Sequence, residues 1–282
     1  MNLCDYETVC RILKKHGFTF SKALGQNFIV NPEICPAMAK SLNAGEKTGV
    51  IEIGAGVGVL TKELCSATGK VVCIELDKRL FPVLNETLAE FNNLELVEGD
   101  VMKLDLNRLI AEKFADMDEV KICANLPYYI TSPVIMKLLE SRLCAAETVV
   151  MVQKEAADRL TAEVGSKSSG ALTVAVSYYA QAEKLFDVDR SSFIPEPKVD
   201  SSVIRLKMRE KPPVEVKDEK HFFAVVKAVF AQRRKTAVNC LSSCLGLPKQ
   251  QVAQALNTIG RSEKDRAESF SMQELALLSE LI

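Results

Sequence analysis

Four consecutive residues in the middle of the chain, Asn125-Leu-Pro-Tyr128, are of types that can hold an amine in place. Asn125 can accept a hydrogen bond through its side-chain oxygen and Leu126 through its carbonyl, while Pro127 shapes the turn without adding an N–H donor. Tyr128 offers a flat face on which a base can stack. The exocyclic amine of adenine is a poor nucleophile, so methyl transfer to it depends on such positioning rather than on a general base. The alternative interpretation is a turn that only caps a strand.

A glycine-rich segment upstream indicates where a methyl donor would bind. Gly54, Gly56 and Gly58 follow the predicted strand Val50–Ile53, and glycines allow a sharp turn and a close approach of a ligand to the backbone. The dinucleotide-binding pattern Gly-x-Gly-x-x-Gly would need a glycine at position 59, where this chain has Val59. The segment therefore lacks the pattern expected for a pyrophosphate site.

Acidic residues end the next two predicted strands. Glu75 lies about 20 residues beyond the glycine turn, where a carboxylate can accept hydrogen bonds from both ribose hydroxyls. Asp100 ends the following strand and can accept from an adenine amine. A ribose acceptor and an adenine acceptor without a phosphate cradle fit S-adenosylmethionine better than NAD. Either acid by itself is compatible with a solvated strand end.

The elements that would position these residues alternate between strand-like and helix-like patterns. The predicted strands are Val50–Ile53, Lys70–Leu76, Leu94–Gly99, Val120–Ala124 and Thr148–Val152. Helical spacing of apolar residues lies between them, for example over Lys78–Phe91 and Pro133–Leu143. This alternation predicts an α/β fold, a Rossmann-like parallel sheet that binds ligands beyond the carboxyl ends of its strands. Two further runs, Leu172–Tyr179 and Ser201–Met208, predict an antiparallel hairpin at the sheet edge.

The last part of the chain has a different pattern. The polar segment Glu210-Lys-Pro-Pro-Val is typical of a stiff linker, and only helical patterns follow it. These helices are predicted over His221–Gln232, Thr236–Cys244, Gln250–Thr258 and Met272–Ile282. We therefore expect a cofactor-binding catalytic domain over residues 1–211 and a small all-helical, RNA-binding domain over residues 212–282.

Composition excludes several classes of protein. The 282 residues include nine cysteines, none in a Cys-x-x-Cys pair, and only two histidines, which argues against a metal site. No apolar run approaches the roughly 18 residues of a membrane span, and the N-terminus lacks the apolar core of a signal peptide. The sequence predicts a cytoplasmic protein with reduced thiols, without a membrane partner, that we expect to be a monomer.

Several motifs, taken in order along the chain, resemble a known family. They are Ser21-Lys22-Ala-Leu-Gly25-Gln26-Asn27-Phe28, Glu52-Ile-Gly54-Ala-Gly56, Asn125-Leu-Pro-Tyr128, Phe193-Ile-Pro195-Glu-Pro197-Lys-Val-Asp-Ser, Arg233-Arg-Lys-Thr and Arg266-Ala-Glu-Ser-Phe-Ser. Together they resemble the RNA adenine N6-dimethyltransferase family, and within it the bacterial enzymes that act on 16S ribosomal RNA. Two small departures are Ala55 in place of the usual proline and Ile29 in place of the usual leucine. Neither removes a polar contact.

The resemblance implies an enzyme that dimethylates two adjacent adenines near the 3′ end of 16S ribosomal RNA in the 30S subunit, late in ribosome assembly. It implies that Phe193 sandwiches the target base opposite Tyr128. It also implies a set of cofactor contacts: Gln26, Asn27, Ile29, Gly54, Gly56, Glu75, Leu76, Asp100, Val101 and Asn125. The segment that contains Gln26 and Asn27 would fold over the methionine end of the cofactor.

A basic segment stands out in a chain whose formal net charge is −1. Arg233, Arg234 and Lys235 follow a predicted helix whose apolar stripe, with Phe222 and Phe223, is typical of a core. We expect the three cations to contact the RNA backbone, because phosphate contacts give salt-dependent affinity. The alternative is that they only complement the dipole at the helix end.

Other functions remain open at this point. A ribosome-assembly factor that binds the immature subunit and methylates only secondarily would carry the same motifs. A related enzyme of the macrolide-resistance type would methylate 23S ribosomal RNA, and only the resemblance chooses between the two RNAs. A DNA adenine methyltransferase is disfavoured, because no recognition domain of useful size remains.

Overall fold

The computed structural model describes residues 1–21 and 25–282, so Lys22, Ala23 and Leu24 of the first motif lie outside the described residues. A seven-stranded sheet dominates the fold, with strand order β4-β3-β2-β5-β6-β9-β7. Its strands are β2 (Thr48–Ile53), β3 (Lys70–Glu75), β4 (Leu94–Glu98), β5 (Glu119–Asn125), β6 (Glu147–Gln153), β7 (Ala180–Val188) and β9 (Ser201–Met208). A separate pair, β1 (Phe28–Ile29) and β8 (Phe193–Ile194), is antiparallel and aligns Ile29 with Phe193.

The parallel part of the sheet runs from β4 to β6, and its central strands are buried along their length. In the register, Ile53 of β2 is aligned with Ile74 of β3 and Ala124 of β5, so the carboxyl ends of these strands lie together. Strand β9 is antiparallel to β6 and β7 is the next strand at the edge. The Rossmann-like sheet predicted from the sequence is therefore confirmed. The five strands predicted between residues 50 and 152 correspond to β2, β3, β4, β5 and β6.

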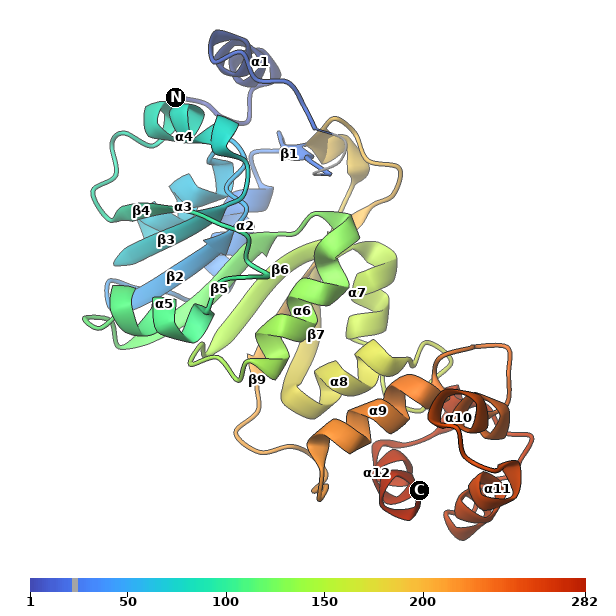
Figure 1. Cartoon of the computed structure of the whole chain (residues 1–282). Helices are drawn as coiled ribbons and strands as arrows, with labels where there is room; N and C mark the ends of the chain where they lie inside the picture. Colours follow the sequence, from blue (N-terminus) through green and yellow to red (C-terminus); the bar gives the residue numbers. More distant parts are fainter. Residues whose placement is uncertain (22–24) are drawn as a thin grey trace. The chain divides into compact units, whose positions relative to one another are not determined.

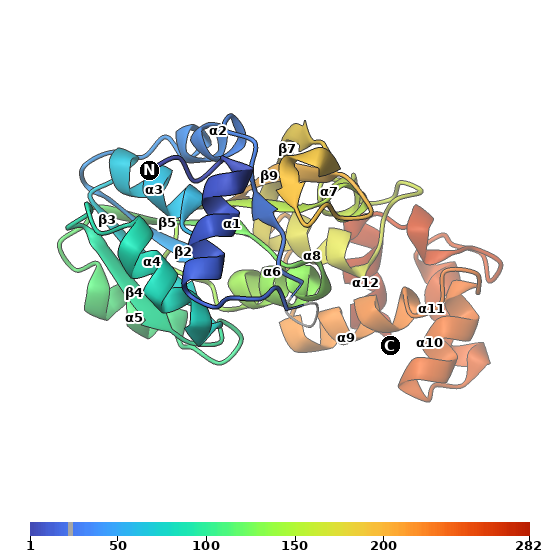
Figure 2. The same ribbon diagram turned by 90° about the horizontal axis from the view of Figure 1, so that it is seen from above.

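Helices cover both faces of this sheet. Helices α2 (Ile34–Ser41), α3 (Val59–Ala67) and α4 (Phe81–Thr87) share one hydrophobic cluster on one face. Helices α5 (Leu106–Lys113) and α6 (Thr131–Glu140) lie on the other face (Figure 1, Figure 2). The N-terminal helix α1 (Tyr6–Lys15) begins at Asp5, whose carboxylate accepts from the Thr8 N–H. It is held against α4 because Lys15 and His16 both contact Glu86, at 2.7 Å each.

One predicted strand is wrong. Leu172–Tyr179 belongs to helix α8 (Ala171–Tyr179), and the edge strand is the following segment, β7. Residues of α8 are buried on nearly all sides, so the sequence shows no alternation that separates a short buried helix from a buried strand. Tyr178 and Tyr179 pack with Phe222 and Phe223, and the Tyr179 ring stacks on Phe223 at 5.3 Å.

The chain divides into two compact units, residues 1–157 with 183–208 and residues 158–182 with 209–282. The second unit thus includes residues 158–182, which the sequence interpretation placed in the first domain. Its helices are α8, α9 (Glu219–Val229), α10 (Ala237–Leu245), α11 (Lys249–Thr258) and α12 (Met272–Leu281), and α7 (Lys154–Leu160) spans the boundary. The four helices predicted after residue 212 are confirmed. Within the described residues, no helix is both long and apolar enough to cross a membrane.

Candidate active site

The predicted catalytic and cofactor residues meet in one pocket at the carboxyl ends of the parallel strands. Segments that follow β2, β3, β4 and β5 form its floor, and residues of the N-terminal segment and β8 complete its wall. All the predicted residues line it: Gln26, Asn27, Ile29, Gly54, Gly56, Glu75, Leu76, Asp100, Val101, Asn125, Leu126, Tyr128 and Phe193. This is the place where open α/β sheets bind ligands.

The glycine turn after β2 leaves room beside the backbone. Gly54, Gly56 and Gly58 have φ values of 82°, 58° and 93°, a region that side chains other than glycine rarely adopt. A Cβ atom on Gly56 would lie 3.1 Å from the Phe28 ring, whereas one on Gly54 would meet only the Asn125 carbonyl oxygen, at 4.0 Å. Gly54 therefore borders open space, and a ligand can approach its backbone closely.

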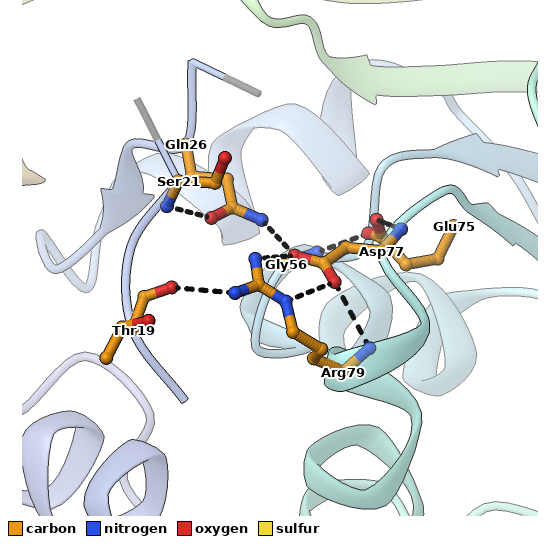
Figure 3. Close-up of polar contacts among 7 residues, drawn as sticks. All are labelled: Thr19, Ser21, Gln26, Gly56, Glu75, Asp77 and Arg79. Carbon is orange, nitrogen blue, oxygen red and sulfur yellow. Dashed lines mark hydrogen bonds and ion pairs between the residues drawn. The ribbon is translucent and has the colours of Figure 1, made fainter. Parts of the chain in front are cut away.

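Glu75 is held rigidly at the end of β3. It is 7% exposed, and its carboxylate accepts from the Asp77 N–H at 2.8 Å and the Gly56 N–H at 3.2 Å (Figure 3). Burial raises the pKa of Glu75 despite these two hydrogen bonds, which oppose the shift. A fixed, largely desolvated carboxylate of this kind is suited to accept hydrogen bonds from ligand hydroxyls.

The charge of the pocket agrees with the cofactor inferred from the sequence. Its described lining includes the acids Glu75 and Asp100 but no lysine, arginine or histidine. Asp100 is itself oriented by the Met102 N–H, which donates to it at 2.9 Å. A dinucleotide would need donors for its phosphates, whereas S-adenosylmethionine has no phosphate and carries a positive sulfonium. The residues present therefore fit S-adenosylmethionine.

The turn formed by residues 125–128 is anchored by three contacts. Asn125 ends β5 and donates from its side-chain nitrogen to the Asn27 carbonyl at 3.4 Å, which leaves its Oδ1 free to accept. The Leu126 N–H donates to the Met151 carbonyl at 3.2 Å and its side chain is buried. Tyr128 begins the short 3-10 helix η3 (Tyr128–Ile130), and its phenol oxygen lies 2.7 Å from Ser201 Oγ. Phe193 also lines the pocket, although it is only 3% exposed.

The chain as a whole resembles known proteins. The model of the family described as ribosomal RNA adenine dimethylase matches residues 17–282 of the chain. The chain belongs to this family. The identification agrees with the lining of the pocket, whose described residues include two acids and no basic side chain.

Individual relatives support the same assignment. The chain is 48% identical over 272 residues to the ribosomal RNA small subunit methyltransferase A of Anoxybacillus flavithermus, covering 95% of this chain and 92% of that protein. It is 47% identical over 273 residues to the protein of the same name from Geobacillus thermodenitrificans, with coverage of 95% and 92%. As a member of the dimethylase family, the chain is an S-adenosylmethionine-dependent ribosomal RNA adenine dimethyltransferase.

Solved structures agree with the fold. A dimethyladenosine transferase from Plasmodium falciparum has a TM-score of 0.72 and 29% identity, covering 89% of this chain and 95% of that one. The 23S rRNA methyltransferase ErmE has a TM-score of 0.66 and 26% identity, covering 90% and 98%. The fold of this chain is therefore one already seen in a dimethyladenosine transferase and in a 23S rRNA methyltransferase.

Sequence reasoning missed residues that support the pocket of this dimethylase from behind. Ser201 fixes Tyr128, and Asp77 accepts from the Gln26 side chain at 2.8 Å. Ser201 ends one of the motifs that carry the resemblance, and Asp77 is two positions after Glu75. Both residues therefore lie in or next to segments that the sequence analysis had already singled out. Their partners are 73 and 51 positions away, and nothing in the sequence pairs them.

The basic segment lies in the second unit. Helix α9 ends at Val229, earlier than predicted, so Arg233, Arg234 and Lys235 lie in the turn before α10. All three are exposed and line a shallow surface hollow together with Gln232. Arg233 donates to the Lys167 carbonyl at 3.0 Å, which orients its guanidinium within the same unit.

Proposed function

We propose that this dimethyltransferase modifies N6 of two adjacent adenines near the 3′ end of 16S ribosomal RNA, in the 30S subunit, late in its assembly. The choice of the small subunit is supported by the relatives at 47–48% identity, which are named as small subunit methyltransferases. The likeness to the 23S rRNA enzyme ErmE is weaker, at 26% identity. A cytoplasmic location fits the nine cysteines, which are all free.

The pocket suggests how the cofactor is held. Glu75 would accept from the ribose hydroxyls, Asp100 from the adenine amine, and Leu76 and Val101 would enclose the adenine ring. Gly54 and Gly56 would allow the backbone to approach the cofactor, while Gln26, Asn27 and Ile29 form the wall on the methionine side. The observation that carries this proposal is that these residues and the Asn125–Tyr128 turn line one pocket.

The chain's own residues would act by positioning the target amine. The Asn125 Oδ1 and the Leu126 carbonyl accept its two N–H donors, which turns the nitrogen lone pair towards the cofactor side of the pocket. Tyr128 and Phe193 hold the base between their rings. When bound, S-adenosylmethionine supplies an electrophilic methyl group, and its sulfur leaves as a neutral thioether. The amine proton becomes acidic once the new N–C bond forms and passes to solvent, so no general base is required.

A methyl-transfer assay tests the proposal directly. The purified protein is incubated with methyl-labelled S-adenosylmethionine and, separately, undermethylated 30S subunits, 50S subunits and duplex DNA. The expected result is label in N6,N6-dimethyladenosine from 30S subunits alone. Label from 50S subunits would instead assign the 23S rRNA substrate, and label in DNA would overturn the RNA assignment.

A variant separates catalysis from a role in subunit assembly. Asn125→Ala removes an amine acceptor while leaving the acids of the cofactor site in place. We expect it to lose methylation and to retain binding of S-adenosylhomocysteine, the cofactor product. If cells with this variant mature 30S subunits normally although a deletion strain does not, binding to the subunit is the main role.

A further inference from the structure

The carboxylate of Asp77 lies directly behind the cofactor pocket and joins two of its walls. Its side chain is 5% exposed, and its Oδ2 accepts from Gln26 Nε2 at 2.8 Å (Figure 3). The Asp77 backbone N–H donates in turn to Glu75 Oε1 at 2.8 Å. Asp77 therefore contacts both Gln26, through its carboxylate, and Glu75, through its backbone N–H, which are the residues that the proposed function places on the methionine and ribose sides of the cofactor.

Arg79 fixes Asp77 in this arrangement. Its Nε donates to Asp77 Oδ1 at 2.8 Å and its Nη2 to Oδ2 at 2.6 Å, which is the bidentate geometry that only a guanidinium can supply. Its remaining arm donates to the Thr19 carbonyl at 3.3 Å. The hydrogen bonds to Arg79 are the largest cause of the lowered pKa of Asp77, so this carboxylate stays ionised.

The same guanidinium covers an aromatic cluster against the glycine turn. Its carbon lies 4.9 Å from the centre of the Phe18 ring, within range of a cation–π interaction. Phe18 contacts Phe28 at 6.1 Å between ring centres, and the Phe28 ring lies beside Gly56. Arg79 thus contacts Phe18 and Thr19 of the N-terminal segment as well as Asp77, although Arg79 itself is absent from the pocket lining.

We propose that Asp77 and Arg79 are positioning residues of the cofactor site, which set the affinity for S-adenosylmethionine by holding Gln26 and Glu75 in their binding geometry. Without Arg79, the nearly buried Asp77 carboxylate loses its charge partner and can rotate away from Gln26. The Gln26 amide would then lose its hydrogen-bond acceptor. The backbone next to Asn27 would be held less firmly as a result. The proposal concerns the cofactor alone and holds whichever ribosomal RNA is methylated.

The test is the equilibrium dissociation constant for S-adenosylhomocysteine, measured by calorimetry. Arg79→Ala is expected to raise this constant about tenfold, the size expected for lost charged hydrogen bonds, and Arg79→Lys to raise it about threefold, because an ammonium restores charge without the bidentate contact. The matched control is Arg108→Ala, which removes an exposed arginine paired with Glu112 on α5. Arg108→Ala should bind S-adenosylhomocysteine as tightly as the unmodified protein does. Binding by the unmodified protein shows separately that the chain has a cofactor site.

A separate readout distinguishes positioning from general damage. In steady-state methylation, Arg79→Ala should raise the KM for S-adenosylmethionine about tenfold, with kcat and the KM for the RNA substrate within about twofold of their original values. Loss of cofactor and RNA affinity together, or an unfolding midpoint well below that of Arg108→Ala, would overturn the proposal. An unchanged dissociation constant in Arg79→Ala would overturn it as well.

A double-mutant cycle tests the route through Gln26. If Arg79 acts through Asp77 on Gln26, the double variant Gln26→Ala with Arg79→Ala should bind no more weakly than the weaker single variant. If the fold-losses of the two single variants multiply in the double variant, Arg79 does not act through Gln26. That outcome would refute the proposed route.

Discussion

The phenol oxygen of Tyr128 lies 2.7 Å from Ser201 Oγ, so the ring that we propose to stack on the target base is tied to the first residue of β9. Burial raises the pKa of Tyr128, although the hydrogen bond to Ser201 opposes the shift. The hydroxyl therefore stays protonated at physiological pH and serves as an anchor rather than as an acid or a base. The position of the ring depends on a contact that joins the turn of residues 125–128 to β9, the strand antiparallel to β6.

This relationship predicts a graded series of variants. Tyr128→Ala should lower kcat/KM for the RNA substrate by roughly 10- to 100-fold, because a stacked base is worth about 1–3 kcal/mol. Tyr128→Phe keeps the ring and loses only the anchor, so a loss of about threefold is expected. Ser201→Ala should lower kcat/KM by the same factor as Tyr128→Phe. The double variant should lower it no further than either single variant does. A Tyr128→Phe variant as impaired as Tyr128→Ala would mean that the hydroxyl, not the ring, is essential.

Substitution of Gly54 by alanine should lower the affinity for the cofactor by more than the backbone strain of the substitution explains. Gly54→Ala places a methyl group in the open space that we assign to the cofactor, at a φ of 82° that costs about 1–2 kcal/mol of stability. Gly246, the cap of α10, has a φ of 69° and nothing within 4 Å of an added Cβ. Both variants should unfold at similarly lower urea concentrations. Only Gly54→Ala should weaken S-adenosylhomocysteine binding, by at least about tenfold, and equal binding by both would place the cofactor elsewhere.

The sequence predicted the parts of the site that depend on local signals. Gly54 directly follows β2, and Glu75 and Asn125 end β3 and β5. Parallel strands bring their carboxyl ends together whatever the details of packing. The contacts that orient these residues could not be predicted in the same way, because Thr19 and Arg79, for example, are 60 positions apart. Helix α8 was missed for a related reason, since only its packing against Phe222 and Phe223 distinguishes it from a strand.

Glu52 predicts an unusual dependence of stability on pH. It is the fifth of the six residues of β2 and is fully buried. Burial raises its pKa from 4.5 to about 8, and the charge of Glu75 contributes. Between these two values the unfolded chain releases a proton that the folded chain keeps. The contribution of Glu52 to stability therefore falls as pH rises, by about 1.4 kcal/mol per pH unit.

The variant Glu52→Gln isolates this effect because glutamine resembles the protonated acid and does not titrate. The free energy of unfolding of both proteins is measured by urea denaturation at several values between about pH 5 and pH 8. The variant should gain stability relative to the original protein as pH rises, while other titrating groups cancel in the difference. A constant difference over this range would show that Glu52 is ionised in the folded state.

The basic turn predicts salt-dependent binding to RNA. Arg233→Ala with Arg234→Ala should weaken binding to 30S subunits and make the slope of log Kd against log salt shallower by roughly 1 to 2, since each phosphate contact contributes slightly less than one unit. Lys211→Ala with Lys220→Ala removes the same charge from exposed positions of the same unit and should change the slope less. Binding of S-adenosylhomocysteine should be unchanged in both variants, because neither alters the pocket. If Arg233→Ala with Arg234→Ala binds subunits as well as the original protein at low and at high salt, these arginines do not contact RNA and serve only the structure of the turn.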